Sequence, residues 1–210
     1  GRARGDVLTC VSFDAGRTAV AIALGNGHTC AVLDNLTVQC WGDNGDGQLG
    51  DGTTTERTTP TYVSLASGSS VAVSERDLDA DGTLNIFDTH LSNYSISAFD
   101  HATCAILDDN LLYCWGDQTN WLDNQFTPTQ VSLPSGRTAL QVDSGFWHTC
   151  AILDDSSLYC WGYNDHGEFG DGTTTSSSSP VQASLPSGRT AVSVAAGFHY
   201  TCAILDDASL

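Results

Sequence analysis

Six of the eight cysteines form three pairs, and the two members of each pair are ten residues apart: Cys30 and Cys40, Cys104 and Cys114, Cys150 and Cys160. Each pair flanks one reversal of the chain, and facing positions on adjacent antiparallel strands lie close enough for a sulfur–sulfur bond. We therefore predict three disulfides, each within one β-hairpin. Zinc is the weaker alternative, because zinc-binding cysteines usually stand two to four residues apart.

Two cysteines, Cys10 and Cys202, are left without a partner in this scheme. Their partners would lie in a longer polypeptide of which this chain is a part. The other interpretation is a bridge between the two, either within one chain or between neighbouring chains.

A second group of candidate ligands lies in residues 77–88, where oxygen-bearing side chains occupy positions 1, 3, 5, 9 and 12 and glycine stands at position 6. This spacing resembles the calcium loop of EF-hands, and most closely its dockerin version. The resemblance implies Ca²⁺ as a structural cofactor, held by Asp77, Asp79, Asp81, Thr83 through its carbonyl, Asn85 and Asp88. The alternative is an acidic loop that is simply solvated.

No residues show the pattern of a nucleophile beside a base and an orienting acid, so we expect a protein that is not an enzyme. Histidines recur before the repeated Thr-Cys step, at His28, His101, His148 and His199. Recurrence once per repeat favours a structural hydrogen bond over a shared metal site. Trp121 and Trp147 fall outside the repeated Trp-Gly pattern, and each is a candidate for either a binding surface or the core.

The hairpins belong to a longer pattern that recurs four times in what we interpret as one repeat domain over residues 1–210. We place the repeats at about residues 11–62, 63–130, 131–182 and 183–210, the last of them truncated. The second copy carries an insertion at about residues 74–96, which contains the calcium-loop candidate.

One motif is shared by the copies: His-Thr-x-Ala-hydrophobic, a short turn, and then Trp-Gly-x-Asn-x-x-Gly-Gln-Leu-Gly, which is complete from Trp41 to Gly50 and varied from Trp161 to Gly170. It resembles the repeat of the regulator of chromosome condensation family, whose blades form a β-propeller. The resemblance implies an all-β fold of propeller blades. Since such rings usually have about seven blades, we expect a partial or incomplete ring here, with disulfide-linked hairpins and one calcium-loop insertion.

The charge and the cysteines restrict the partners and the compartment. A formal net charge of −18 repels phosphate backbones, so we expect no nucleic acid partner. No apolar stretch is long enough to span a bilayer. Persistent disulfides indicate an extracellular, secreted protein. Asn35 and Asn93 begin Asn-x-Ser/Thr sequons that are candidate glycosylation sites in that compartment.

Two functions of different class fit these features. The favoured one is an extracellular, non-catalytic structural or adhesive scaffold module that self-associates, as a subunit of a fibre or a head-to-tail assembly. The alternative is a secreted propeller that recognises a protein or carbohydrate ligand through its loop face.

Overall fold

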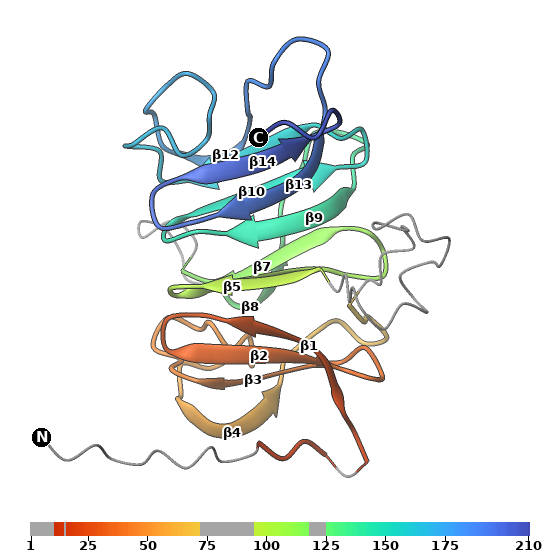
Figure 1. The fold of residues 1–210 in the computed structure, drawn as a ribbon. Coiled ribbons are helices and arrows are strands. Elements are labelled where there is room, and N and C mark those ends of the chain that lie inside the picture. The colour runs from red at the N-terminus through yellow and green to blue at the C-terminus, as the bar shows by residue number, and fades with distance from the viewer. Residues whose placement is uncertain (1–10, 15, 72–94, 118–124) are drawn as a thin grey trace, which may run out of the picture.

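The computed structural model describes residues 11–14, 16–71, 95–117 and 125–210. The regular secondary structure in these ranges consists of β-strands alone (Figure 1). The strands are β1 (Ala19–Leu24), β2 (His28–Leu33), β3 (Val38–Gly42), β4 (Arg57–Tyr62), β5 (Ile96–Phe99), β6 (Ala102–Ile106), β7 (Leu112–Gly116), β8 (Gln125–Gln130), β9 (Ala139–Ser144), β10 (His148–Leu153), β11 (Leu158–Gly162), β12 (Ser177–Gln182), β13 (Ala191–Ala196) and β14 (Thr201–Leu205). Within these ranges no helix could cross a membrane.

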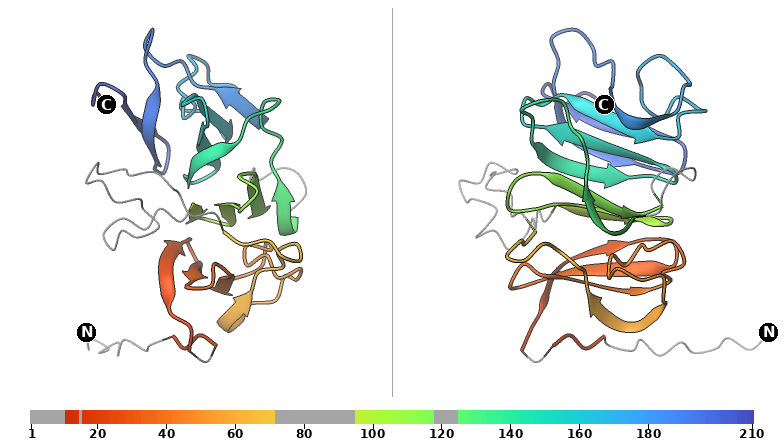
Figure 2. Two further views of the ribbon diagram at one scale, coloured as in Figure 1. Left: turned by 90° about the vertical axis from the view of Figure 1, so that its right-hand side faces the viewer. Right: turned by 180° about the vertical axis from the view of Figure 1, so that it is seen from behind.

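The strands form four antiparallel sheets that follow one another along the chain: β1–β4, β5–β8, β9–β12 and the two-stranded β13–β14. We call these sheets blades 1 to 4. The first strand of each blade contacts the first strand of the next, and the blades stack in chain order (Figure 2). The all-β propeller expected from the sequence is confirmed.

Each predicted hairpin disulfide is formed, because the hairpin register places the two cysteines of a pair directly opposite each other. Cys30 faces Cys40, Cys104 faces Cys114 and Cys150 faces Cys160, with Cα atoms 4.1 Å apart in every case. All six cysteines are fully buried. The disulfides therefore lie inside the hydrophobic cores.

The cores lie between the blades. One cluster joins Val32 and Leu49 of blade 1 to Leu107 and Trp115 of blade 2. Two further clusters join blade 2 to blade 3 and blade 3 to blade 4 in the same way. Alternation along the second strand explains this arrangement, since successive side chains face the preceding and the following blade in turn.

The glycine of the repeated Trp-Gly step is required by a close backbone approach. Gly162 has a φ of +105°, and a Cβ atom there would lie 2.2 Å from the carbonyl oxygen of Trp147. Any side chain would therefore combine backbone strain with a clash against the turn that carries Trp147. The Trp-Gly step fixes this turn against the end of β11.

The Trp115→Ala variant is expected to lose about 3–5 kcal/mol of unfolding free energy, measured by urea denaturation. The indole is fully buried between blades 1 and 2, and its Nε1 donates a hydrogen bond to the Gln48 carbonyl oxygen at 3.0 Å. The matched control is Trp41→Ala, at the same position of blade 1, where the ring is only half-buried and meets Phe13 edge-on. Equal losses in the two variants would contradict this account.

Several residues that the sequence singles out fall outside the described ranges. They are Cys10, the calcium-ligand candidates Asp77, Asp79, Asp81, Thr83, Asn85 and Asp88, the sequon Asn93, and Trp121.

Candidate functional site

The turns at one end of the blades gather on a common face. The start of β2 pairs with the end of β3, His28 opposite Gly42, so the turn before β2 and the long loop after β3 leave the sheet at the same end. We call this end the turn face. It comprises the turns between first and second strands (25–27, 100–101, 145–147, 197–200) and the glycine-rich loops after the third strands (43–56, 163–176).

Two of the four recurring histidines, His28 and His148, link neighbouring blades below the turn face, as the hydrogen-bond hypothesis predicted. The other two, His101 and His199, lie beside acidic side chains instead. His28 Nε2 lies 2.8 Å from Thr103 Oγ1, and the Thr103 hydroxyl donates to the Gln48 carbonyl oxygen at 3.0 Å. Because that hydroxyl has a single proton, His28 Nε2 must be the donor to Thr103. His148 Nε2 makes the same contact with Thr201 Oγ1 of blade 4, at 2.9 Å.

Both of these histidines are held in the neutral form. Burial, and to a smaller extent the nearby His101, lower the pKa of His28 to about 4. Burial likewise lowers the pKa of His148 to about 4, although the Glu168 carboxylate acts in the opposite direction. Neither histidine is suited to act as an acid or base near neutral pH, since each is buried and has a structural partner.

An aromatic cluster occupies the turn face of blades 3 and 4. The ring of Phe146 stacks on Phe198 with centroids 4.0 Å apart, and Trp147 lies 4.4 Å from Phe146. Tyr163 extends the cluster from the neighbouring loop, 5.4 Å from Trp147. Phe198 is 50% exposed. Large aromatic rings that remain accessible on turns are typical of binding surfaces.

Blades 1 and 2 carry the same backbone contact without the aromatic side chains. Asn26 N donates to the Asp100 carbonyl oxygen at 3.3 Å, as Phe146 N does to the Gly197 carbonyl oxygen. In blades 1 and 2 the side chains of these two residues also form a hydrogen bond, which Asn26 Nδ2 donates to Asp100 Oδ1 at 3.1 Å. Stacked phenyl rings replace this polar pair between blades 3 and 4, so the aromatic cluster is not a general requirement of the fold.

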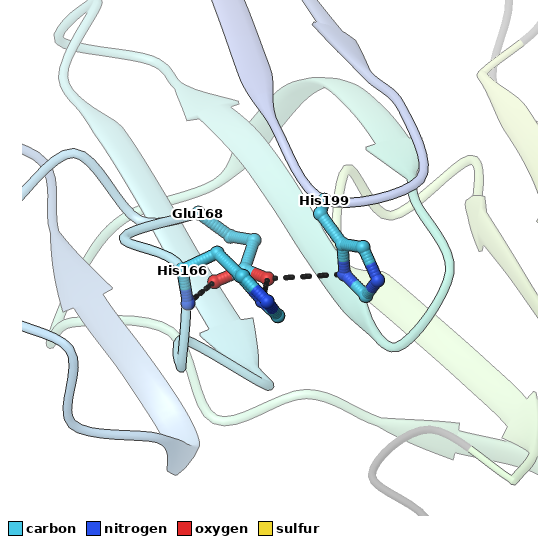
Figure 3. A group of neighbouring side chains, drawn as sticks. All are labelled: His166, Glu168 and His199. Atoms are coloured by element: carbon cyan, nitrogen blue, oxygen red, sulfur yellow. Dashed lines mark hydrogen bonds and ion pairs between the residues drawn. The ribbon is translucent and has the colours of Figure 1, made fainter.

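A group of three side chains, His166, Glu168 and His199, lies beside the aromatic cluster (Figure 3). His166 and Glu168 belong to the glycine-rich loop of blade 3, and His199 belongs to the β13–β14 turn. Burial by itself raises the pKa of Glu168. Hydrogen bonds from backbone groups and from the His166 ring, together with the nearby His148, lower this pKa more strongly. The net effect holds the pKa of Glu168 below its usual value. Glu168 is therefore a carboxylate that faces two imidazole rings.

The described arginines are all neutralised by acidic side chains. The ion pairs are Arg17–Asp34 (3.5 Å), Arg57–Asp51 (2.6 Å), Arg137–Asp155 (3.0 Å) and Arg189–Asp207 (3.1 Å). The whole chain has 25 acidic residues against 7 basic ones, so acidic side chains greatly outnumber basic ones. The chain therefore carries a strongly negative electrostatic field.

The structure brings only some of the predicted site residues to this face. Trp147 is in the aromatic cluster, half-buried by its neighbours. Asn35 is exposed at the β2–β3 turn, at the opposite end of blade 1, where its Oδ1 accepts a hydrogen bond from Thr37 Oγ1 at 2.7 Å. Cys202 is exposed as a free thiol on β14.

Sequence reasoning did not single out Phe146, Phe198 or Tyr200. A signal was present in the tripeptide before each His-Thr-Cys or Tyr-Thr-Cys step: the turns read Gly-Asn-Gly in blade 1 but Gly-Phe-Trp and Gly-Phe-His in blades 3 and 4. Aromatic residues at turn positions, where the other repeats have small or polar ones, mark a surface that the fold itself does not need.

Comparison with known proteins gives matches over most of the chain. Two models of the regulator of chromosome condensation (RCC1) repeat match it, one at residues 37–74 and 155–204 and the other at residues 19–48 and 140–168. The ultraviolet-B receptor UVR8 of Arabidopsis thaliana is 29% identical over 204 residues, which are 92% of this chain and 41% of the receptor. The E3 ubiquitin-protein ligase HERC2 of Homo sapiens is 41% identical over 56 residues, which are 27% of this chain and 1% of the ligase.

Among solved structures, the ectodomain of the receptor kinase CR4 from Physcomitrella patens is similar, with a TM-score of 0.53 and 19% identity. The match covers 90% of this chain and 39% of that one. The chain thus spans less than half the length of each of these three relatives. Since the two repeat models together match more than half of the chain, and the sheets are arranged as propeller blades, the chain belongs to the RCC1-repeat family of β-propellers.

Proposed function

We propose that this chain is a secreted, non-catalytic recognition propeller that binds a basic protein partner through the aromatic turns of blades 3 and 4. The observation that carries the proposal is the aromatic cluster of Phe146, Trp147, Tyr163 and Phe198. Tyr and Trp are enriched among the residues that contribute most to protein binding, and the large ring of Phe also buries much apolar area on contact.

Charge supports a basic partner. The chain has a formal net charge of −18, and its described arginines are already paired within the molecule. Such a field accelerates association with a cationic protein and weakens as salt is added. We therefore expect the association rate to fall as ionic strength rises.

The secreted location rests on the three buried disulfides, which persist in oxidising compartments. A related fold occurs in the CR4 receptor kinase ectodomain, which is compatible with this location. The exposed Asn35 would accept a glycan there. Calcium binding by residues 77–88, which lie outside the described ranges, remains part of the proposal.

The Phe198→Ala variant is expected to bind at least about tenfold more weakly, because a well-placed aromatic contact contributes about 2 kcal/mol or more to an interface. Binders would be selected from a random peptide display library on the folded chain, and their dissociation constants compared between variants by calorimetry. Selected sequences should be rich in Lys and Arg.

The matched control for this experiment is Phe126→Ala. Phe126 is 42% exposed, close to the exposure of Phe198, but it lies on β8, the outermost strand of blade 2. If both variants lose binding equally, or if neither loses it, the aromatic turns are not the contact surface.

A scaffold role, in which copies of the chain associate through their blades, is the second candidate. Electron microscopy of the purified protein separates the two roles, since filaments indicate a scaffold and discrete particles indicate a recognition module.

A further inference from the structure

We propose that His166, Glu168 and His199 form a binding site for a divalent transition metal, with Zn²⁺ as the expected ion. The three residues come from two blades, so a bound ion would join the glycine-rich loop of blade 3 to the β13–β14 turn of blade 4 (Figure 3).

The spacing of the ligand atoms fits a tetrahedral ion. Glu168 Oε1 lies 3.2 Å from His166 Nδ1 and 3.4 Å from His199 Nδ1, and one ligand atom from each residue lies within 4.8 Å of the others. Zinc is bound at about 2.0–2.2 Å by nitrogen and oxygen, so two ligands of a tetrahedral ion stand roughly 3.3–3.5 Å apart.

The carboxylate is positioned before any ion arrives. Glu168 is buried, its side chain only 1% exposed, and its Oε2 accepts a hydrogen bond from the backbone N–H of His166 at 2.9 Å. This bond leaves Oε1 directed at the two imidazole rings. A hydrogen bond to the second oxygen of a metal-binding carboxylate fixes its orientation and is typical of built metal sites.

The rings leave one side open to solvent. The side chains of His166 and His199 are 58% and 37% exposed, so an ion can enter from the turn face. Three protein ligands with a fourth position for water are a common arrangement for zinc. Two imidazoles and one carboxylate suit Zn²⁺ and its transition-metal neighbours, whereas Ca²⁺ and Mg²⁺ prefer sites made of oxygen alone.

The interface between blades 1 and 2 supplies a natural comparison. There Asp46, Gln48 and His101 stand at the positions of His166, Glu168 and His199. The local geometry is retained: Gln48 Oε1 accepts a hydrogen bond from Asp46 N at 2.9 Å, and His101 Nδ1 lies 3.2 Å from Asp46 Oδ2. Here a carboxylate stands in place of one imidazole and a neutral amide in place of the carboxylate, so only two strong ligands remain and this interface should bind the same ion more weakly.

Binding would be tested by titrating the intact chain with Zn²⁺ in calorimetry and with Co²⁺ in visible absorption. Free thiols are first alkylated, which removes Cys202 as a ligand, and excess Ca²⁺ in the buffer occupies any oxygen-rich site. The expected result is one ion per chain and the intense absorption bands of tetrahedral Co²⁺.

The informative variants are Glu168→Gln and His199→Ala. Gln48 shows that glutamine is compatible with the loop, so E168Q should fold normally and bind Zn²⁺ at least about tenfold more weakly. The reverse exchange, Asp46→His with Gln48→Glu, should create a second site with His101 and raise the stoichiometry to two ions per chain.

The proposal is overturned if the parent chain takes up no Zn²⁺ in the micromolar range, or if E168Q and H199A bind it as tightly as the parent. It is also overturned if the Co²⁺ complex lacks tetrahedral bands. A failure of the peptide-binding test above would leave this result untouched, because the two measurements use different ligands and different variants.

Discussion

Reduction of the three disulfides is expected to lower the free energy of unfolding by about 8 kcal/mol, which is comparable to the entire stability of many domains. Each bridge closes a loop with a sequence separation of 10, and the chain-entropy relation gives about 2.5–3 kcal/mol for a loop of this size. We expect the reduced chain to be largely unfolded at physiological temperature. Urea titrations followed by circular dichroism, with and without prior reduction in denaturant, measure the difference.

A single pair provides the control. Replacement of both Cys150 and Cys160 by alanine removes the bridge within the β10–β11 hairpin of blade 3 and should cost about one third of the total. An unchanged unfolding midpoint after complete reduction would show that the hydrophobic interfaces alone hold the blades together, and it would remove the main argument for an oxidising compartment.

Acidification from pH 6.5 to pH 4 is expected to cost about 3 kcal/mol for each of His28 and His148. In the folded chain both have a pKa of about 4, chiefly because of burial, against about 6.5 when unfolded. Between these values the unfolded chain binds protons that the folded chain does not, so the equilibrium shifts toward unfolding. The stabilising contribution of the two neutral histidines to the folded state is fully present above pH 6.5 and is lost as the pH falls through 4.

The double variant His28→Gln, His148→Gln isolates this effect. Glutamine can still donate a hydrogen bond toward Thr103 or Thr201, but it does not titrate. The unfolding free energy of the variant should be nearly flat between pH 6.5 and pH 4.5, while that of the parent falls steeply. Parallel curves for the two proteins would assign the acid sensitivity to other groups.

The cysteine spacing and the alternation of apolar residues within each repeat were sufficient to predict the hairpins. The spacing between Cys150 and Cys160, with alternating apolar residues after the first cysteine, defines one antiparallel register, and the structure has that register. The role of His28 and His148 also followed from their recurrence. Both features depend on contacts that recur in more than one repeat, so comparing the copies reveals them.

Contacts that differ between repeats were not predictable in this way. The His166–Glu168 pair is visible in the sequence only as a departure from Asp46 and Gln48, and nothing local shows that His199, in the next blade, completes the group. The stacking of Phe146 on Phe198 likewise joins residues of two blades. Such groups arise from the packing of one repeat against another, which a repeat pattern alone does not specify.

Because the hydrophobic clusters are shared by neighbouring sheets, the smallest portion of this protein able to fold cooperatively is a pair of blades. An excised single blade would expose half of two cores, and it should behave as a disordered peptide even with its sulfur bridge intact. A gene fragment that encodes blades 2 and 3 together, by contrast, retains one complete cluster. Domain boundaries for recombinant expression should therefore be chosen so that each interface remains whole.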